Sequence, residues 1–457
     1  MLDEKIMQMK DDIIKGVQAS VRIKSVEEPP LPGMPFGKGV HESLEHCLQL
    51  SKTLGFDAVN MDNMIGYAEY GQGDEMVAVL GHLDVVPEGE GWTYPPYAAE
   101  IHDGKIIGRG TTDDKGPTIG ALYALKAIEE LNIPLKRRVR IFFGLNEETG
   151  ARGVKHYVAN GGEMPVCGFT PDAEYPIING EKGIVNCRYQ RAFSTHGDFY
   201  LGSITGGLAV NVVPDHAQAV IVVPAHKMTQ VLEMAEKADG ISAQPIGSTV
   251  KINSTGINAH AATPEKGHNA ITQLLLFLDS INMPGDAGEF LRFFAKNVGA
   301  DINGRALGIF CEDDVSGLFT FNLGVINGDE KGIEIGMNMR YPVTHTYEEF
   351  ISTFEEKMAL GKLSEVSRIH KPCLYISPDT PFIKKLQKVY EEKTGETADL
   401  ISIGGGTYAK AMPNVVAFGP IFKGQPMVEH KPDEYIKIDE LLINVQIMAA
   451  AIVELAN

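Results

Sequence analysis

Histidine and carboxylate side chains gather in this sequence at points where an apolar stretch ends and a polar turn begins. The apolar run "MVAVL" is followed by "GHLDVVP", which places His82 and Asp84 two positions apart. In an extended strand such residues face the same way, so the carboxylate can orient the imidazole as a metal ligand. The other residues of this kind, at comparable junctions or in a late polar segment, are Asp113, Asp114, Glu147, Glu148, Asp172 and His430.

Each of these residues, taken alone, has an ordinary structural explanation. An aspartate that precedes a helix, such as Asp113 or Asp114, is commonly an N-cap. The adjacent Glu147 and Glu148 are typical of a solvated turn, and His82 is compatible with a hydrogen-bonded interior histidine. These explanations weaken when the junctions lie at one end of one sheet, because the acidic groups would repel one another unless a cation lay among them. Histidines and carboxylates without cysteine suit zinc, manganese or cobalt in a catalytic site better than a structural zinc.

The elements that would position these residues alternate between strands and helices up to about residue 180. Apolar spacing predicts helices over 1–24, 41–56 and 117–133, and buried strands over 76–86 and 137–144. This alternation predicts an α/β fold with a mostly parallel central sheet flanked by helices. In such sheets ligands bind beyond the carboxyl ends of the strands, which is where the polar junctions lie.

The pattern changes after "NGEKG", which ends at Gly183. Strands are predicted over 216–225 and 248–260, with helices over 271–281 and 346–358, which is typical of α+β structure with antiparallel sheets. Helical α/β character returns after Pro378, and the chain ends in a helix over 437–456. We therefore predict an α/β domain formed by 1–183 and 378–457, interrupted by an α+β insertion over 184–377.

Composition and charge exclude several classes of function. The chain has 60 acidic and 41 basic residues and a net charge of −19, which argues against nucleic acid and against anionic membrane surfaces as partners. Its five cysteines form no CxxC pair, which favours a reducing compartment. The N-terminal stretch lacks the apolar segment of a signal peptide, and no apolar run reaches membrane-spanning length, so a cytoplasmic protein is expected.

Five motifs in order resemble those of the di-metal aminopeptidase, carboxypeptidase and deacylase superfamily, which includes acetylornithine deacetylase, succinyl-diaminopimelate desuccinylase and carnosinase. They are "GHLDVVP", "GRGTTDDKGP", "NEETG", "PDAEYP" and "EHKPDEY", and they extend from residue 81 to residue 435. The subgroup that the sequence resembles most is that of the bacterial PepV-type dipeptidases. The chain departs from many relatives after "EETG", where Arg152 stands between Ala151 and Gly153.

The resemblance implies a role for each junction residue. His82 and Asp172 would bind one divalent cation, Glu148 and His430 would bind the other, and Asp113 would bridge the two. Asp84 would orient His82, and Glu147 would be the general base that takes a proton from water and returns it to the leaving amine. The ions would be two Zn²⁺, with Mn²⁺ or Co²⁺ as alternatives. The resemblance also implies a cis peptide bond between Asp113 and Asp114.

The interrupting segment resembles the family's lid domain, here long enough for two α+β subunits. Its "GINAHAATP" segment makes His260 the expected donor to the oxyanion of the reaction. Asn211 and Arg340 are expected to contact substrate, with Arg340 suited to a bidentate grip on a carboxylate. In "SIGGGTYA", the backbone N–H groups of Gly405, Gly406 and Thr407 could hold the same carboxylate, since this segment lacks the ending of a phosphate loop. A solvated arginine and a flexible turn are the structural alternatives.

These features predict a di-metal metallopeptidase that hydrolyses dipeptides. The alternative within enzymes is an N-acyl-amino-acid deacylase, which would share the motifs and differ only in the pocket for the amine end. A non-catalytic peptide-binding protein is a further alternative, which the intact Glu147 and the complete ligand set disfavour. The second lid subunit can occupy the place that the lid of a partner subunit would take in a dimer. We therefore expect a catalytically competent monomer, whose lid hinges near Gly183 and Pro378.

Overall fold

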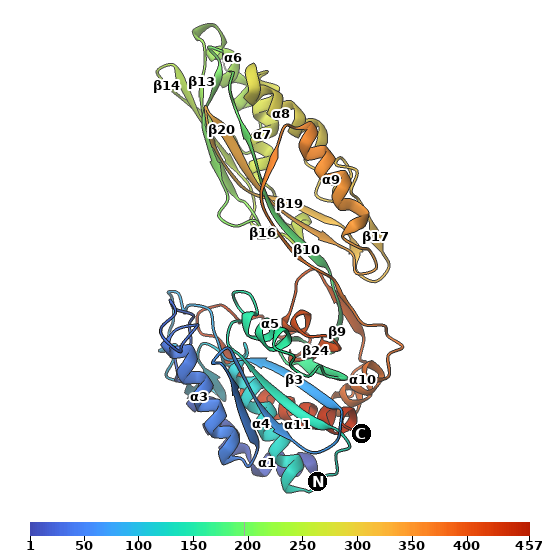
Figure 1. The fold of residues 1–457 in the computed structure, drawn as a ribbon. Coiled ribbons are helices and arrows are strands. Elements are labelled where there is room, and N and C mark those ends of the chain that lie inside the picture. The colour runs from blue at the N-terminus through green and yellow to red at the C-terminus, as the bar shows by residue number, and fades with distance from the viewer. Residues whose placement is uncertain (196) are drawn as a thin grey trace. The chain divides into compact units, whose positions relative to one another are not determined.

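The computed structural model describes residues 1–195 and 197–457 of the chain, which divide into two compact units (Figure 1). The first unit holds Met1–Asn179, Ile376–Ile401 and Gly406–Asn457, and the second holds Gly180–Tyr375 and Ser402–Gly405. The short segment Ser402–Gly405 groups with the second unit because the backbone N–H of Lys182 donates to the carbonyl of Ile403 and Arg340 donates to the carbonyl of Gly404. None of the helices in the described residues is long and apolar enough to cross a membrane.

The first unit is built around a twisted sheet in the order β1-β2-β6-β3-β7-β24-β9. The central strands β6, β3, β7 and β24 are parallel, whereas β1, β2 and β9 are antiparallel to their neighbours. The predicted α/β architecture with a mainly parallel central sheet is therefore confirmed. The sheet strands are β1 (Asp57–Met61), β2 (Ile65–Tyr70), β3 (Met76–His82), β6 (Arg138–Gly144), β7 (Cys167–Thr170), β9 (Ile177–Glu181) and β24 (Val415–Ala417).

Helices cover this sheet, and most of them share one continuous apolar core with it. The side chains of Val139, Ile141 and Phe143 on β6 belong to this core, whereas the alternate residue Phe142 packs against Tyr157 of α5 on the other face. The helices are α1 (Leu2–Gln8), α2 (Lys10–Val21), α3 (Lys38–Thr53), α4 (Lys115–Glu130), α5 (Arg152–Ala159), α10 (Pro381–Thr394), α11 (Ile438–Leu455) and the 3₁₀ turn η2 (Tyr408–Ala411).

Short strands at the border of the first unit carry the loops of the candidate site. A small sheet has the order β26-β5-β4, and β25 pairs with β8 in parallel. In the small sheet Ile436 of β26 pairs with Ile106 of β5. The segment that follows His430 therefore lies beside the segment that precedes α4. These short strands are β4 (Glu100–His102), β5 (Lys105–Ile107), β8 (Ala173–Glu174), β23 (Leu400–Ile403), β25 (Pro420–Ile421) and β26 (Tyr435–Lys437).

The N-terminal helix differs from the sequence prediction of a single helix over 1–24. It is two helices, α1 and α2, which meet at Met9, and α2 ends at Val21. The N–H of Met9 donates to the carbonyls of both Lys5 and Ile6, which tightens the turn there without exposing the apolar face. Ile6 and Ile13 remain fully buried on either side of the break, so the predicted apolar stripe is retained.

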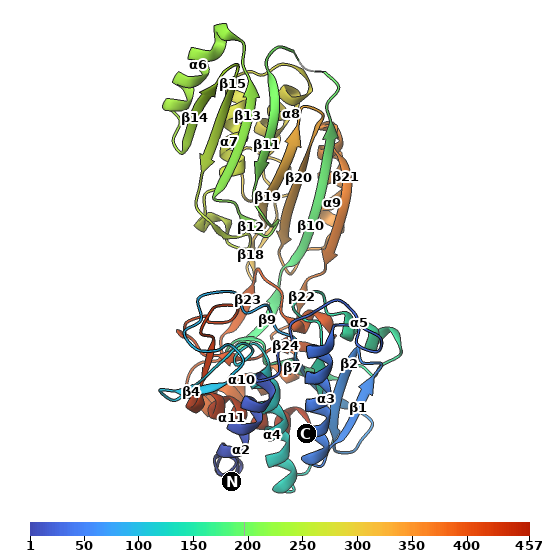
Figure 2. The ribbon, with the colours of Figure 1, turned by 90° about the vertical axis from the view of Figure 1, so that its left-hand side faces the viewer.

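The second unit has one continuous antiparallel sheet in the order β14-β15-β13-β11-β19-β20-β10-β21 (Figure 2). The longer strands are β10 (Gly183–Ala192), β11 (Tyr200–Gly206), β13 (His216–Val222), β14 (Ile241–Ile246), β15 (Thr249–Thr255), β19 (Thr320–Asp329), β20 (Gly332–Tyr341) and β21 (Ser364–Lys371). The short strands are β12 (Val212–Val213), β16 (Ala259–His260), β17 (Glu312–Asp313), β18 (Gly317–Leu318) and β22 (Leu374–Tyr375).

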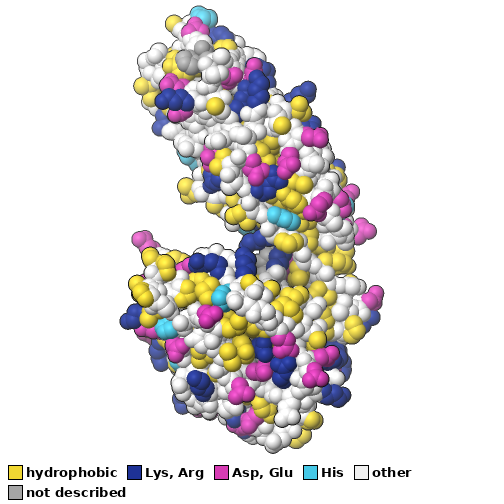
Figure 3. All heavy atoms as spheres, viewed as in Figure 1, with side chains coloured by type: hydrophobic (Ala, Val, Ile, Leu, Met, Phe, Trp, Pro, Cys, Tyr) yellow, Lys and Arg dark blue, Asp and Glu magenta, His cyan; other side chains and the backbone are white. Residues whose placement is uncertain are grey.

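Helices α7, α8 and α9 lie on one face of this sheet (Figure 1), and their apolar residues form a second core with the strands. The helices are α6 (Ala225–Glu236), α7 (Ala270–Ser280), α8 (Gly285–Asn297), α9 (Glu348–Leu360) and the 3₁₀ turn η1 (Pro264–Lys266). On the face drawn in Figure 3, acidic and basic side chains are interspersed, as is usual for a solvent-exposed surface.

The strand predicted over 248–260 is divided in two. β15 ends at Thr255, and Gly256 then lies so close to the carbonyl oxygen of His268 that an added Cβ would be 2.0 Å from it. The chain turns away there, and Ala259–His260 pairs with β12 instead of continuing along β15. His260 therefore stands on a separate two-stranded ribbon of the second unit.

Candidate metal centre

The carboxyl ends of three parallel strands of the first unit hold most of the predicted site residues. His82 is the last residue of β3 and pairs in register with Gly144, the last residue of β6. The turn that carries Glu147 and Glu148 follows β6, and Asp172 follows β7. This is the edge at which α/β sheets bind ligands.

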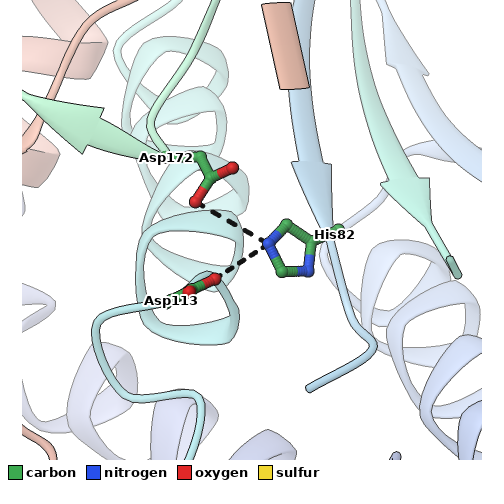
Figure 4. Close-up of side chains that lie close together, drawn as sticks. All are labelled: His82, Asp113 and Asp172. Atoms are coloured by element: carbon green, nitrogen blue, oxygen red, sulfur yellow. Dashed lines mark ion pairs between the residues drawn. The ribbon is translucent and has the colours of Figure 1, made fainter. Parts of the chain in front are cut away.

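Three of these side chains converge on one point, as Figure 4 shows. The Nε2 atom of His82 lies 2.9 Å from Oδ1 of Asp113 and 3.7 Å from Oδ1 of Asp172. His82 is fully buried, and the side chains of Asp113 and Asp172 are 14% and 13% exposed. A strand end, a loop after a strand and a loop before a helix thus each supply one potential ligand atom.

A second group of three lies beside the first and shares Asp113 with it. The Nε2 atom of His430 lies 2.9 Å from Oδ2 of Asp113 and 3.2 Å from Oε2 of Glu148. The two oxygens of the Asp113 carboxylate therefore face different groups, Oδ1 toward His82 and Oδ2 toward His430. This is the arrangement expected of a carboxylate that bridges two cations, as in two-metal sites.

Potential ligand atoms in both groups lack hydrogen-bond partners, which also favours a bound metal ion. Among the residues that the structure describes, Nε2 of His82, Oδ1 of Asp113 and Oε1 of Glu148 are buried and have no hydrogen-bond partner. Buried polar atoms are rarely left unsatisfied, and atoms that approach one another without hydrogen-bond geometry are expected when they share a cation. Imidazole and carboxylate donors without thiolate suit the divalent ions predicted from the sequence.

Asp84 holds the turn that carries the two glutamates. Its side chain is 1% exposed, and its Oδ1 and Oδ2 accept hydrogen bonds from the backbone N–H groups of Glu147 and Glu148, each at 3.1 Å. Nδ1 of His82 lies 3.0 Å from the carbonyl oxygen of Asp84 and 3.4 Å from its carboxylate. The residue predicted to orient His82 is therefore in contact with it and also fixes the Glu147–Glu148 turn.

Glu147 directly precedes Glu148 in the sequence but belongs to neither group. Burial raises the pKa of its carboxyl well above the usual value, and the Asp172 carboxylate raises it further. The pKa of His82 is also raised, because its contacts with Asp113 and Asp172 outweigh the effect of burial, which lowers it. A carboxyl group with a raised pKa next to candidate ligands has the properties of a proton carrier.

Asp114 is a residue whose contacts the sequence did not reveal. It precedes α4 at the N-cap position, but its side chain does not cap the helix. Instead its Oδ2 accepts hydrogen bonds from the backbone N–H of His82 at 3.1 Å and from Thr118 Oγ1 at 3.0 Å, so it ties the Asp113 loop to β3. The peptide bond between Asp113 and Asp114 is cis, as the resemblance implies.

Arg152 takes part in a small network around the glutamate turn. Its backbone N–H and its Nε both donate to Oδ1 of Asn146 at 3.1 Å, and its guanidinium pairs with Glu27. The Nδ2 group of Asn146 also donates to Glu27, at 2.8 Å. The turn after β6 is therefore fastened to the N-terminal segment that follows α2, a link that sequence spacing does not indicate.

Arg340, a predicted substrate residue of the second unit, contacts His260 and the segment that includes Gly405. Arg340 is 3% exposed, and its Nε donates to Asn338 Oδ1 at 3.0 Å while its Nη1 donates to the carbonyl of Gly404 at 2.5 Å. Its Nη2 lies 3.4 Å from Nε2 of His260. Burial and the charge of Arg340 lower the pKa of His260, which favours the neutral imidazole.

The remaining predicted residues are divided between the two units. Asn211 is exposed, and its carbonyl accepts a hydrogen bond from the N–H of Ala261, next to His260. Gly405 belongs to the second unit with Gly404, whereas Gly406 and Thr407 belong to the first. The Thr407 side chain caps the turn η2 by accepting a hydrogen bond from the N–H of Ala409 at 3.2 Å.

Comparisons with known proteins identify the family of the chain. The model of peptidase family M20/M25/M40 matches residues 78–454. YtjP of Bacillus subtilis (strain 168), named as a candidate dipeptidase, is 42% identical over 99% of both chains. A Beta-Ala-Xaa dipeptidase of Lactobacillus delbrueckii subsp. lactis is 35% identical over 98% of this chain and 97% of its own. The crystal structure of human carnosine dipeptidase 1 has the same fold, with a TM-score of 0.57 at 16% identity over 100% of this chain and 99% of that one. The chain belongs to peptidase family M20/M25/M40 and is a metallopeptidase.

Proposed function

We propose that this protein hydrolyses the peptide bond of dipeptides with two divalent cations held by the two groups that share Asp113. The observation that carries the proposal is the division of the Asp113 carboxylate, with Oδ1 near His82 and Oδ2 near His430. His82 and Asp172 would complete one site, and Glu148 and His430 the other. The donor set favours Zn²⁺, and it is also compatible with Mn²⁺ or Co²⁺.

When bound, the cations would lower the pKa of a water molecule and polarise the scissile carbonyl. Glu147 takes a proton from the attacking water and returns it to the nitrogen of the leaving amine. Its backbone N–H is fixed by the Asp84 carboxylate, which keeps the glutamate at the border of the site.

The second unit would act as a lid that supplies contacts to the substrate. His260 donates a hydrogen bond to the oxyanion of the tetrahedral state, and a neutral imidazole next to Arg340 suits that role. Arg340, with the backbone of Gly405, Gly406 and Thr407, binds the free carboxylate of the dipeptide, and Asn211 is a further polar contact. The cluster of His260, Arg340 and Gly404 within the second unit supports this assignment.

The biological setting belongs to the same proposal. The substrate is a small peptide, and the net charge of −19 supports neither nucleic acid nor an anionic membrane as a partner. The five cysteines of the sequence include no CxxC pair, which suits a reducing, cytoplasmic environment. We further propose that a single chain is catalytically competent.

A substrate panel tests the proposal. The protein is treated with a chelator and supplied with Zn²⁺, Mn²⁺ or Co²⁺, and free dipeptides, tripeptides, dipeptide C-terminal amides and N-acetyl amino acids are compared. We expect hydrolysis only after a metal is restored, with free dipeptides cleaved fastest. Preferential cleavage of N-acetyl amino acids would instead assign the deacylase function, and activity that persists in the chelated protein would contradict the metal dependence.

A further inference from the structure

The carboxylate of Glu434 is buried in the first unit and faces the loop that carries Asp113. Its side chain is 0% exposed. Its Oε1 accepts hydrogen bonds from the backbone N–H groups of Gly110, Thr112 and Asp113, at 3.1, 3.0 and 3.3 Å. Its Oε2 accepts a hydrogen bond from Nη1 of Arg109 at 2.6 Å. Four hydrogen bonds, one of them from a charged guanidinium, thus hold the Glu434 carboxylate in a single orientation.

The backbone on both sides of Glu434 adds to this connection. The N–H of Gly108 donates to the Glu434 carbonyl at 2.8 Å, and Thr112 Oγ1 donates to the carbonyl of Tyr435, also at 2.8 Å. Arg109 is 1% exposed, and its guanidinium lies over the ring of Trp92 at 5.3 Å from the centroid. The partner of the Glu434 carboxylate is therefore itself held in place.

Glu434 connects two residues that are remote in sequence but lie in one group of candidate ligands. It follows His430 by four positions on the same loop, and it binds the N–H of Asp113, 321 positions away. Asp113 and His430 are two of the three members of the group that Glu148 completes. One buried side chain therefore joins the two segments of chain that carry two members of that group.

The group formed by His82, Asp113 and Asp172 has a separate attachment. Among the described residues of that group, only Asp113 has a hydrogen bond to Glu434, and the neighbouring Asp114 ties the loop to the backbone N–H of His82. Loss of the Glu434 contact should therefore disturb the two groups unequally.

We propose that Glu434, paired with Arg109, is a positioning residue that sets the affinity of the cation site formed by Asp113, Glu148 and His430. This inference rests on the proposed two-cation function. It concerns a residue that need not touch either cation or the substrate and that acts by fixing the distance between Asp113 and His430. Residues that hold metal ligands in place without touching the metal typically contribute about 10- to 100-fold to metal affinity.

Glu434→Gln is the informative variant because its amide has a single oxygen. If that oxygen faces the three N–H groups, the amide NH₂ faces the Arg109 guanidinium, so that donor meets donor. In the opposite orientation the NH₂ faces the three backbone N–H groups. Either arrangement removes part of the contact while the volume of the side chain is retained.

The measurement is a calorimetric titration of the metal-free wild type and variant with Co²⁺ alone. We expect two binding events in the wild type. In Glu434→Gln one event should keep its affinity within about threefold, and the other should weaken by about tenfold or more. His430→Ala, which removes a ligand of the affected site, should retain the same single strong event. Equal weakening of both events, or no change in either, would overturn the proposal.

Asp433→Asn is the matched control because Asp433 is the adjacent carboxylate on the same loop. Its Oδ1 accepts hydrogen bonds from the N–H groups of Thr93 and Tyr94, at 2.8 and 3.4 Å, instead of from the Asp113 loop. Both binding events should be unchanged in this variant. A selective loss as large as that of Glu434→Gln would show that any change in the loop weakens the site, which would overturn the specific role of Glu434.

Two further measurements distinguish a failure of this inference from a failure of the variant to fold and from a failure of the proposed function. If Glu434→Gln does not fold, Arg109→Lys replaces the planar fork with a point charge, and the same event should weaken by severalfold. Unchanged binding in that folded variant would overturn the inference. Fewer than two events in the wild type would instead refute the two-cation function, whatever the variants show.

Discussion

At the scale of single residues, the two oxygens of a carboxylate serve two purposes at once in this site. Asp113 presents one oxygen to each group of candidate ligands, and Asp84 gives one oxygen to each of two successive backbone N–H groups. Substitution by an amide removes one acceptor and adds a donor, so such variants test both functions without changing the size of the side chain.

Asp84→Asn should therefore impair catalysis without unfolding the protein. The amide can accept a hydrogen bond from Glu147 or from Glu148 but not from both, and its NH₂ group then faces an N–H. We expect a loss of about 10- to 100-fold in kcat/KM, measured on a free dipeptide with saturating metal. Asp62→Asn, at an exposed carboxylate that pairs with His156, is the control and should leave the rate unchanged. Wild-type kcat/KM in Asp84→Asn would refute this role.

Arg340→Ala tests recognition of the substrate carboxylate. Because Arg340 is buried and bonded to Asn338 and Gly404, the substitution will also cost stability, so KM alone is not decisive. The ratio of kcat/KM for a dipeptide to that for its C-terminal amide does not depend on the folded fraction. We expect this ratio to fall by about 10- to 100-fold, the value of a hydrogen bond to a charged group. A ratio equal to that of the wild type would exclude Arg340 as the carboxylate receptor.

Residue types and spacing, together with the family resemblance, were enough to select the members of both ligand groups, since His82, Glu148 and Asp172 lie at or after the ends of strands, Asp113 lies before a helix, and His430 lies in one of the five family motifs. They were not enough for Asp114, Asn146 or Glu434. The contacts of these residues depend on which loops meet in space, and the Glu434–Asp113 contact joins positions 321 apart. A buried carboxylate in a polar motif such as "KPDEY" has no local signature that separates it from a solvated one.

At the scale of elements, the site depends on close packing of η2 against the ends of β3 and β6. The ring of Tyr408 lies edge-on to that of His82, with 6.0 Å between centroids. Gly144, at the end of β6, leaves room for this ring, because an added Cβ would lie 2.1 Å from the Tyr408 hydroxyl and 2.7 Å from two ring carbons. Close packing at this point keeps the imidazole in place.

Gly144→Ala should destabilise the protein by about 1–3 kcal/mol through overpacking. The free energy of unfolding from denaturant titration measures this cost. In a Tyr408→Phe background, where the nearest atom is absent but the ring remains, the cost of Gly144→Ala should be smaller. Equal costs in the two backgrounds would show that the clash with Tyr408 is not the cause.

The longer helices and the central strands β3 and β6 of the first unit follow from apolar periodicity, because these strands are buried, mainly hydrophobic runs and α4 and α11 are long. The break at Met9 was not predictable, because a tightened turn retains the apolar stripe that defines the helix. In the second unit the sequence indicated strands and helices, but the single eight-stranded sheet depends on long-range pairing, such as that of β10 with both β20 and β21. Local patterns carry no information on such partners.

At the scale of the whole molecule, the proposal that one chain suffices for catalysis predicts the behaviour of mixed variants. Glu147→Gln and His260→Ala proteins are each expected to be inactive, the first for lack of a proton carrier and the second for lack of an oxyanion donor. If His260 serves its own chain, a mixture of the two should remain inactive at every ratio and after prolonged incubation. Recovery of activity in the mixture would show that His260 acts across subunits.

The most direct test of the account is the activity of Glu147→Gln measured together with its metal content. Glu147 precedes Glu148 in the sequence but belongs to neither ligand group, so the variant should bind as many cations as the wild type. Its kcat on a free dipeptide should fall by about 100-fold or more, because a general base has been removed. Retention of more than about a tenth of kcat, with the metal in place, would contradict the assignment of Glu147 as the base.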